Sequence, residues 1–160
     1  MAAPHQIRLS DGTAIGGDRV YVIAEAGVNH NGSIARAVEM VEMAARAGAD
    51  AVKFQTFSAE RLVTGSAPKA AYQQEHTGGG SQQDMLRALE LSHADHETLM
   101  AACRDNQVTF LSTPFEEQSA DLLDGFDVAA FKLPSGELTN IPFLRHVAAK
   151  GRPMIISTGM

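Results

Sequence analysis

Five short apolar runs, each separated from the next by a segment with helical or loop character, constrain the fold of this chain more than any other feature. The runs cover 20–24, 51–55, 108–111, 128–133 and 154–156, and the first of them is rich in β-branched residues. After the first run, Ile34, Val38, Val41 and Ala45 recur at intervals of four, three and four, which places them on one face of a helix. Strands that alternate with helices in this way predict a parallel sheet covered by helices.

The expected helices begin and end at residues that are typical of helix termini. Ser33 is a good N-cap and Gly48 a typical residue just past a helix end, and Ser92 with Asp95 predicts a capping box. Pro142 suits a first helical turn. We therefore expect helices over 34–47, 93–103, 117–123 and 142–150.

The placement of polar residues distinguishes between an open doubly wound sheet and a (β/α)8 barrel. No GxGxxG follows the first run, which removes the main support for a dinucleotide-binding sheet. In the second run Val52 and Phe54 share one face, and Lys53 and Gln55 share the other. Polar groups also stand at the ends of other runs, at Glu25, Thr113 and Lys132. Inward polar groups at the carboxyl ends of strands are typical of the catalytic mouth of a TIM barrel.

The predicted fold is therefore α/β, of the (β/α)8 TIM-barrel type, with only the first five strands present. A complete barrel takes about 250 residues, and this chain has 160. We expect residues 1–19 to be a polar leader and residues 20–160 to be the N-terminal part of a barrel domain. Such a portion would have an open sheet edge and exposed apolar surface.

Composition excludes some functional classes. The formal charge of −6 argues against nucleic-acid binding, which needs a basic face. Residues 1–10 lack the apolar centre of a signal peptide, and no stretch approaches the roughly 18 apolar residues of a membrane span. We expect a cytoplasmic protein without membrane or nucleic-acid partners. Cys103, the single cysteine, is expected to pack as a reduced thiol on the inner face of its helix.

A glycine-rich loop and three histidines are considered as parts of an active site or a metal site. The polar stretch that contains 78–80 lies where an active-site loop of a barrel would be. His30 lies in a tight Asn-His-Asn-Gly connection and is not expected to bind metal. His93 and His96 are predicted to be exposed residues in the first turn of their helix, so the chain is expected to contain no metal ligands.

Five motifs resemble the N-acetylneuraminate (sialic acid) synthase family, in the family's order and spacing. They are IAEAGVNHNG at 23–32, ADAVKFQTF at 49–57, LSTPF at 111–115, KLPSGE at 132–137 and STGM at 157–160. The family includes synthases of sialic, legionaminic and pseudaminic acids. The forms at 112–115 and 135–137 look more like the sialic and legionaminic branches than the pseudaminic one.

The resemblance implies an enzyme, a transferase that condenses phosphoenolpyruvate with an N-acetylated hexosamine similar to N-acetylmannosamine and releases phosphate. Matching positions imply one catalytic residue, Glu25. They imply a phosphoenolpyruvate site that consists of Lys53, Thr113, Lys132, Ser135 and Ser157. They also imply sugar-binding roles for Gln55 and Glu137. The residue types fit these roles, because fixed cations and hydroxyl donors suit a substrate with a carboxylate and a phosphate.

The resemblance further implies a divalent metal, Mn or Mg, whose histidine ligands come from later barrel strands beyond residue 160, and a homodimer in the full-length enzyme. The segment 76–80 departs from the family pattern, which puts a phosphate contact from that loop in doubt. Alternatives stay open: a legionaminic acid synthase, a related barrel that condenses phosphoenolpyruvate with a sugar phosphate, or a non-catalytic fragment that binds phosphoenolpyruvate. The second is disfavoured because the inward cations are only Lys53 and Lys132. The isolated chain is expected to be inactive.

Overall fold

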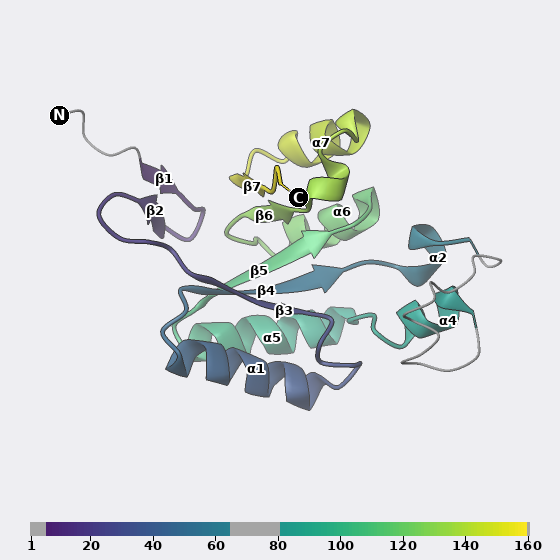
Figure 1. The fold of residues 1–160 in the computed structure, drawn as a ribbon, viewed down its shortest axis with the longest axis horizontal. Helices are drawn as coiled ribbons and strands as arrows, with labels where there is room; N and C mark the ends of the chain where they lie inside the picture. Colours follow the sequence, from purple (N-terminus) through teal and green to yellow (C-terminus); the bar gives the residue numbers. More distant parts are fainter. Residues whose placement is uncertain (1–5, 65–80, 160) are drawn as a thin grey trace.

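The computed structural model describes residues 6–64 and 81–159, and its centre is a five-stranded parallel sheet (Figure 1). The strands are β3 (Ile23–Gly27), β4 (Ala51–Thr56), β5 (Thr109–Pro114), β6 (Phe131–Leu133) and β7 (Met154–Ile156). They pair in sequential order, β3-β4-β5-β6-β7, and every pairing is parallel. A doubly wound sheet reverses its strand order at a switch point. The unbroken order confirms the predicted partial TIM barrel.

The expected helices are confirmed at α1 (Ile34–Arg46), α5 (His93–Asp105), α6 (Glu117–Gly125) and α7 (Ile141–Ala148). Their predicted start signals are also observed. The Ser33 side chain accepts from the Arg36 amide, and Ser92 and Asp95 form a full capping box. Helices α1 and α5 lie side by side along the sheet (Figure 1). Helix α1 contacts β3 and β4, and both α5 and α6 contact β5.

The N-terminal segment, for which no element was expected, contains an antiparallel hairpin of β1 (Gln6–Arg8) and β2 (Ala14–Gly16). Leu9 in its connection is buried against residues at the amino ends of the strands, among them Ala51 and Leu111. The Ser10 amide donates to the Ala129 carbonyl at 2.9 Å. The hairpin therefore covers the end of the sheet opposite the predicted catalytic mouth.

Two short helices interrupt the stretch that was expected to be a loop. They are α2 (Ala59–Leu62) and α4 (Gln82–Arg87). The glycine-rich segment 76–80 and its questioned phosphate contact lie outside the described residues. No helix within the described ranges is long and apolar enough to cross a membrane.

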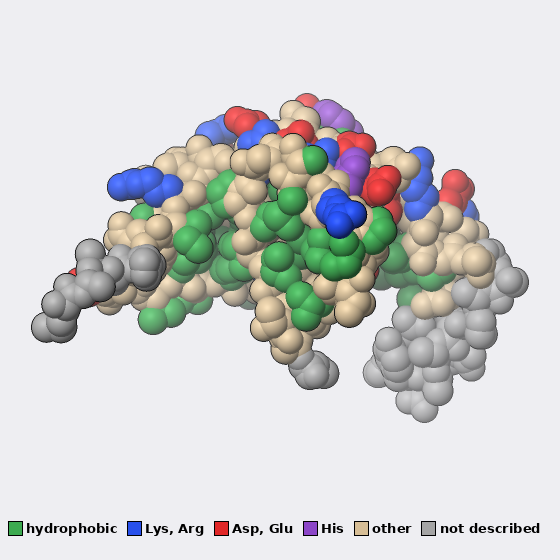
Figure 2. Space-filling view, turned by 90° about the horizontal axis from the view of Figure 1, so that it is seen from above, with side chains coloured by type: hydrophobic (Ala, Val, Ile, Leu, Met, Phe, Trp, Pro, Cys, Tyr) green, Lys and Arg blue, Asp and Glu red, His purple; other side chains and the backbone are tan. Residues whose placement is uncertain are grey.

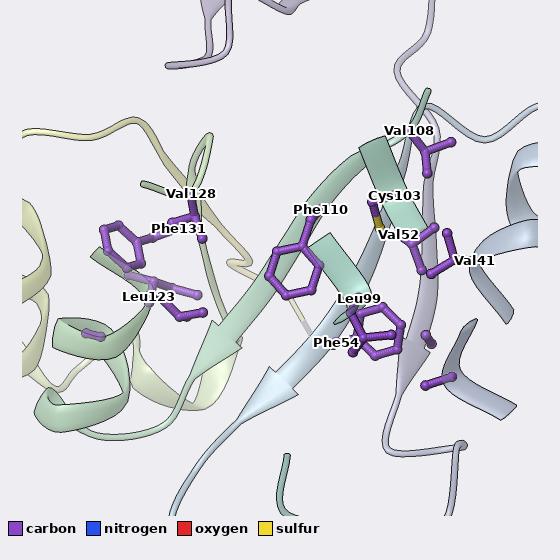
Figure 3. Close-up of a cluster of buried hydrophobic side chains, with 14 of the residues drawn as sticks. Val41, Val52, Phe54, Leu99, Cys103, Val108, Phe110, Leu123, Val128 and Phe131 are labelled. Carbon is purple, nitrogen blue, oxygen red and sulfur yellow. The ribbon is translucent and has the colours of Figure 1, made fainter. Parts of the chain in front are cut away.

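The main core lies between the sheet and its helices, as the alternation in strand β4 predicts (Figure 3). Val52 and Phe54 point into this layer, where Phe54 stacks on Phe110 with ring centroids 5.9 Å apart. Leu99 and Cys103 of α5 pack against them. Cys103 is free and buried, which confirms the predicted packing of its thiol on the inner face of the helix. Burial raises the pKa of the Cys103 thiol to about 12.

Within the described residues the sheet has open edges at β3 and β7. Beside β3 a hollow of about 280 Å³ is lined mainly by apolar residues of β3 and α1, including Ala24 and Met43. On the side of β7 and α7, Figure 2 shows apolar side chains gathered at the surface. Exposed Leu138, Ile141 and Ile156 belong to this part of the chain. The expected open edge and exposed apolar surface are thus observed.

Candidate active site at the carboxyl ends of the strands

Glu25 and Lys53 form an ion pair on the inner face of the sheet. Strand register places the two residues side by side on β3 and β4, and Lys53 Nζ lies 2.6 Å from Glu25 Oε1. The Lys53 side chain is 9% exposed, whereas that of Glu25 is 57% exposed. A nearly buried cation therefore meets a carboxylate that water can still reach.

Lys132 adds a second cation to this group. Its Nζ donates to Ser157 Oγ at 2.6 Å and to the Leu133 carbonyl at 3.0 Å. Burial lowers the pKa of Lys132, the nearby Lys53 cation lowers it further, and the Glu25 carboxylate opposes both effects. Two ammonium groups that repel each other near a single carboxylate form a site that an anion would stabilise.

Gln55 and Thr113 lie beside this charged group. They are register partners on β4 and β5, and Thr113 is buried with a hydroxyl that has no hydrogen-bond partner among the described residues. A buried hydroxyl without a partner is costly. Thr113 is therefore suited to a ligand that supplies the missing bond.

Gly27 allows Glu25 and Gln55 to approach each other, a role that the sequence analysis did not assign. A Cβ atom on Gly27 would lie 3.0 Å from Glu25 Oε1 and 3.6 Å from Gln55 Nε2, and its φ of +55° is unfavourable for other residues. Its position between a strand-end acid and the Asn-His-Asn-Gly connection was the signal that could have identified it.

Ser135 and Glu137 are placed differently from the other predicted site residues. Both lie in the 3-10 turn η1 (Ser135–Glu137) that follows β6. Ser135 is exposed, and the Glu137 carboxylate accepts from Asn140 Nδ2 at 2.7 Å, at the start of α7. The structure thus brings together Glu25, Lys53, Gln55, Thr113, Lys132 and Ser157, and directs Glu137 toward a helix terminus.

The described residues do not fit a metal ion. In 6–64 and 81–159, no group of three or more His, Cys, Asp or Glu side chains is arranged to hold one. His30 is buried in its tight connection, where Nδ1 accepts from the Gly32 amide at 3.1 Å. The divalent metal that the resemblance implies remains an expectation, and its ligands were expected outside this chain.

The prediction that His96 is exposed is wrong. His93 is indeed exposed, but His96 is fully buried and stacks on Phe126. The physical reason is helical spacing, because His96, Leu99 and Cys103 lie three and four residues apart on the buried face of α5. That spacing was visible in the sequence, where the capping position was given more weight.

The chain is similar in sequence to proteins of a known family. Residues 40–160 match the NeuB family. The chain is 51% identical to an N,N'-diacetyllegionaminic acid synthase of Legionella pneumophila, over 88% of the chain and 40% of that protein. It is 34% identical to the human N-acetylneuraminate-9-phosphate synthase, over 98% of the chain and 44% of that protein. It thus spans less than half the length of these curated relatives.

Among solved structures, the chain resembles the N-acetylneuraminic acid (sialic acid) synthetase of Leptospira borgpetersenii, determined in complex with citrate. The TM-score is 0.79 at 28% sequence identity, and the match covers 99% of the chain and 51% of that structure. The partial barrel described above therefore has a counterpart in a longer, experimentally determined barrel chain.

Proposed function

The chain belongs to the NeuB family, and on this premise we propose that it supplies the phosphoenolpyruvate-binding part of a nonulosonic acid synthase. The proposed reaction is the condensation of phosphoenolpyruvate with an N-acetylated amino sugar, with release of phosphate. Because the chain spans less than half of its curated relatives, the activity is proposed for the enzyme to which these residues belong.

The observation that carries the proposal is the pair of lysines beside a buried hydroxyl that has no hydrogen-bond partner in the part of the chain that the structure describes. Phosphoenolpyruvate has a carboxylate and a phosphate, so its binding requires fixed positive charges and hydrogen-bond donors. Lys53 and Lys132 supply the charges, and the Lys53 charge contributes to the lowered pKa of Lys132. Thr113 and Ser157 offer hydroxyl groups. Ser135 is assigned to the same substrate from the family resemblance alone.

Glu25 is proposed to carry the proton chemistry. The methylene carbon of phosphoenolpyruvate forms a bond to the aldehyde carbon of the open-chain sugar, which leaves a cation at C2. The π bond of the aldehyde breaks, and its oxygen takes up a proton and becomes a hydroxyl. Water then adds to C2, and breaking the bond between C2 and the phosphate oxygen releases phosphate and a ketone. A carboxylate beside the cation stabilises it and accepts the proton of the attacking water. Glu25 is suited to this role because its side chain remains accessible to water.

The sugar is proposed to be a diacetamido sugar rather than N-acetylmannosamine. The identity of 51% to a diacetyllegionaminic acid synthase favours this branch of the family. Phosphoenolpyruvate contains no nitrogen, so both acetamido groups of that product must come from the sugar. Gln55 and Glu137 are the residues expected to bind the sugar. The divalent metal, the homodimer and the cytoplasmic location also remain predictions.

Direct binding of phosphoenolpyruvate to the chain tests the proposal. Calorimetric titration should detect binding to the unmodified chain. Lys53→Met and Lys132→Met should each weaken it by about 30-fold or more, as expected for loss of a charged partner worth about 2–4 kcal/mol. Lys150→Met is the matched control, because Lys150 pairs with Asp121 in the helical layer. No binding, or equal losses in all three variants, would overturn the proposal.

Turnover separates the enzyme from a non-catalytic binding module. In an active enzyme that contains these residues, Lys53→Ala and Lys132→Ala should raise the KM for phosphoenolpyruvate more than the KM for the sugar. Phosphate release with a diacetamido hexose should exceed release with N-acetylmannosamine, while the isolated chain should release none above background. Binding without turnover in every context would favour the binding module.

A further inference from the structure

Three polar side chains form a connected network inside the otherwise apolar layer between sheet and helices. Thr56 ends β4, Ser112 lies on β5, and His96 lies in the first half of α5. Their exposed fractions are 3%, 1% and 0%. Thr56 Oγ1 lies 2.7 Å from Ser112 Oγ and 2.8 Å from His96 Nε2, and His96 Nδ1 lies 2.8 Å from the Ser92 carbonyl oxygen.

The direction of each hydrogen bond follows from the chemistry of the partners. The Ser92 carbonyl can only accept, so His96 Nδ1 carries the proton and donates to it. Burial lowers the pKa of His96, which favours the neutral ring. In a neutral ring Nε2 is an acceptor, so the Thr56 hydroxyl donates to it and accepts from the Ser112 hydroxyl. Each of the three side chains is therefore hydrogen-bonded, and only one set of donor and acceptor roles satisfies all three bonds.

Stability alone does not account for such a network. Polar groups inside an apolar layer are costly unless they are fully bonded, and apolar residues of similar shape are often equally stabilising. A fully bonded network instead restricts the groups that form it to a unique arrangement. The network must therefore be considered together with what lies on the other side of the same strands.

We propose that His96 is a positioning residue that orients Gln55 and Thr113 through Thr56 and Ser112. Side chains alternate along a strand, so Thr56 faces the helices where its neighbour Gln55 faces the site. Ser112 and Thr113 are related in the same way, and Gln55 and Thr113 are register partners. His96 holds the Thr56 hydroxyl, and Thr56 in turn holds Ser112. These bonds restrict the backbone of β4 and β5, and the backbone sets the direction of Gln55 and Thr113. The consequence for ligand binding rests on the proposed function, but the positioning itself does not.

Variants of His96 and Thr56 separate positioning from packing. Thr56→Val keeps the volume and removes the hydroxyl. His96→Gln places an amide near the position of Nε2 and retains a partner for Thr56, whereas His96→Asn places one near Nδ1 and retains only the bond to Ser92. Both histidine variants lose the packing of the ring. Ser119→Ala is the control, because Ser119 is a buried serine whose hydroxyl donates to the Glu116 carboxylate outside the network.

The readout is the NMR resonances of the Gln55 side-chain amide and the Thr113 methyl group in the chain itself. They should shift or broaden in Thr56→Val and His96→Asn, return toward their original positions in His96→Gln, and stay unchanged in the Ser119→Ala control. Phosphoenolpyruvate affinity should follow the same pattern, with losses of about tenfold, as is found for residues that orient metal ligands.

Each result decides the inference. Unchanged Gln55 and Thr113 resonances in Thr56→Val and His96→Asn, with only the melting temperature lowered, would show that the network is structural and overturn the proposal. Equal effects of His96→Gln and His96→Asn would show that ring packing is responsible, which also overturns it. If the unmodified chain does not bind phosphoenolpyruvate, the proposed function fails, but the resonances still test the positioning.

Discussion

The ion pair of Glu25 and Lys53 predicts unequal losses of stability when either partner is replaced, because the two side chains differ in burial. Lys53→Met removes a side chain that is 9% exposed and leaves a carboxylate that is 57% exposed and can be hydrated. Glu25→Gln leaves an ammonium group with little water around it and with the Lys132 cation nearby. The loss of stability therefore depends on which charge remains, and it is larger when the buried Lys53 ammonium group is left without its partner.

The magnitudes follow from the geometry. At the observed separation of 2.6 Å, the Coulomb attraction is about 6 kcal/mol for an effective dielectric constant of about 20, and about 1.6 kcal/mol for one of about 80. Desolvation of the ammonium group offsets this by several kcal/mol. We expect Lys53→Met to change the free energy of unfolding by less than about 1 kcal/mol, and Glu25→Gln to lower it by about 1–3 kcal/mol.

Urea denaturation of the chain, followed by circular dichroism, measures both effects. If Lys53→Met destabilises the chain as much as Glu25→Gln does, the ion pair is net stabilising and the argument from unequal burial is refuted. The catalytic role requires a second measurement in an active enzyme. There Glu25→Gln should lower kcat by about 10²–10⁴-fold per folded molecule with little change in either KM. A destabilised variant with near-normal turnover would make Glu25 structural.

Three further predictions concern the helical layer. Cys103 should react with a thiol reagent at pH 8 only as fast as the chain unfolds, because its pKa is raised to about 12; rapid labelling of folded chain would contradict its burial. Burial lowers the pKa values of His96 and His30, so the folded state binds fewer protons than the unfolded state below about pH 6.5. Stability should be complete above that pH and fall as the pH drops through the folded pKa values, with a smaller loss in His96→Gln when urea midpoints at pH 7 and 5.5 are compared. Ser92→Ala should lower the free energy of unfolding by about 1 kcal/mol and Ser92→Gly by only a few tenths; equal losses would show that the cap does not act through its geometry.

The regular elements were predictable where one face of a segment is buried and the other is not. The apolar faces of α1 and β4 repeat at helical and strand periods, so the sequence indicates both their type and their orientation. The hairpin was missed because its strands have three residues each and hardly any buried side chain. Leu9, which attaches it to the sheet, stands alone between Arg8 and Ser10, and a single apolar residue forms no period.

The candidate site was predictable residue by residue but not as a set of contacts. Alternation along β4 is enough to place Lys53 and Gln55 on the inner face. The pairing of Lys53 with Glu25 depends on the register between strands separated by a whole helix, which local pattern does not contain. The local sequence pattern also does not indicate that Glu137 bonds Asn140. Nor does it indicate that His96 is connected to β4 through Thr56 and from there to Ser112 on β5.

The sequential strand order also has a consequence for the way in which the chain folds. Each strand of the sheet pairs with the one synthesised just before it, so the sheet can grow one unit at a time from its amino end as the polypeptide emerges. The hairpin is different, because Asp11 accepts from the Thr109 hydroxyl 98 residues further along and Ser10 donates to Ala129. Loop closure over such separations is entropically costly until the intervening units exist. The hairpin is therefore synthesised before the strands on which it docks, and its docking marks the completion of the units that carry Lys53 and Thr113.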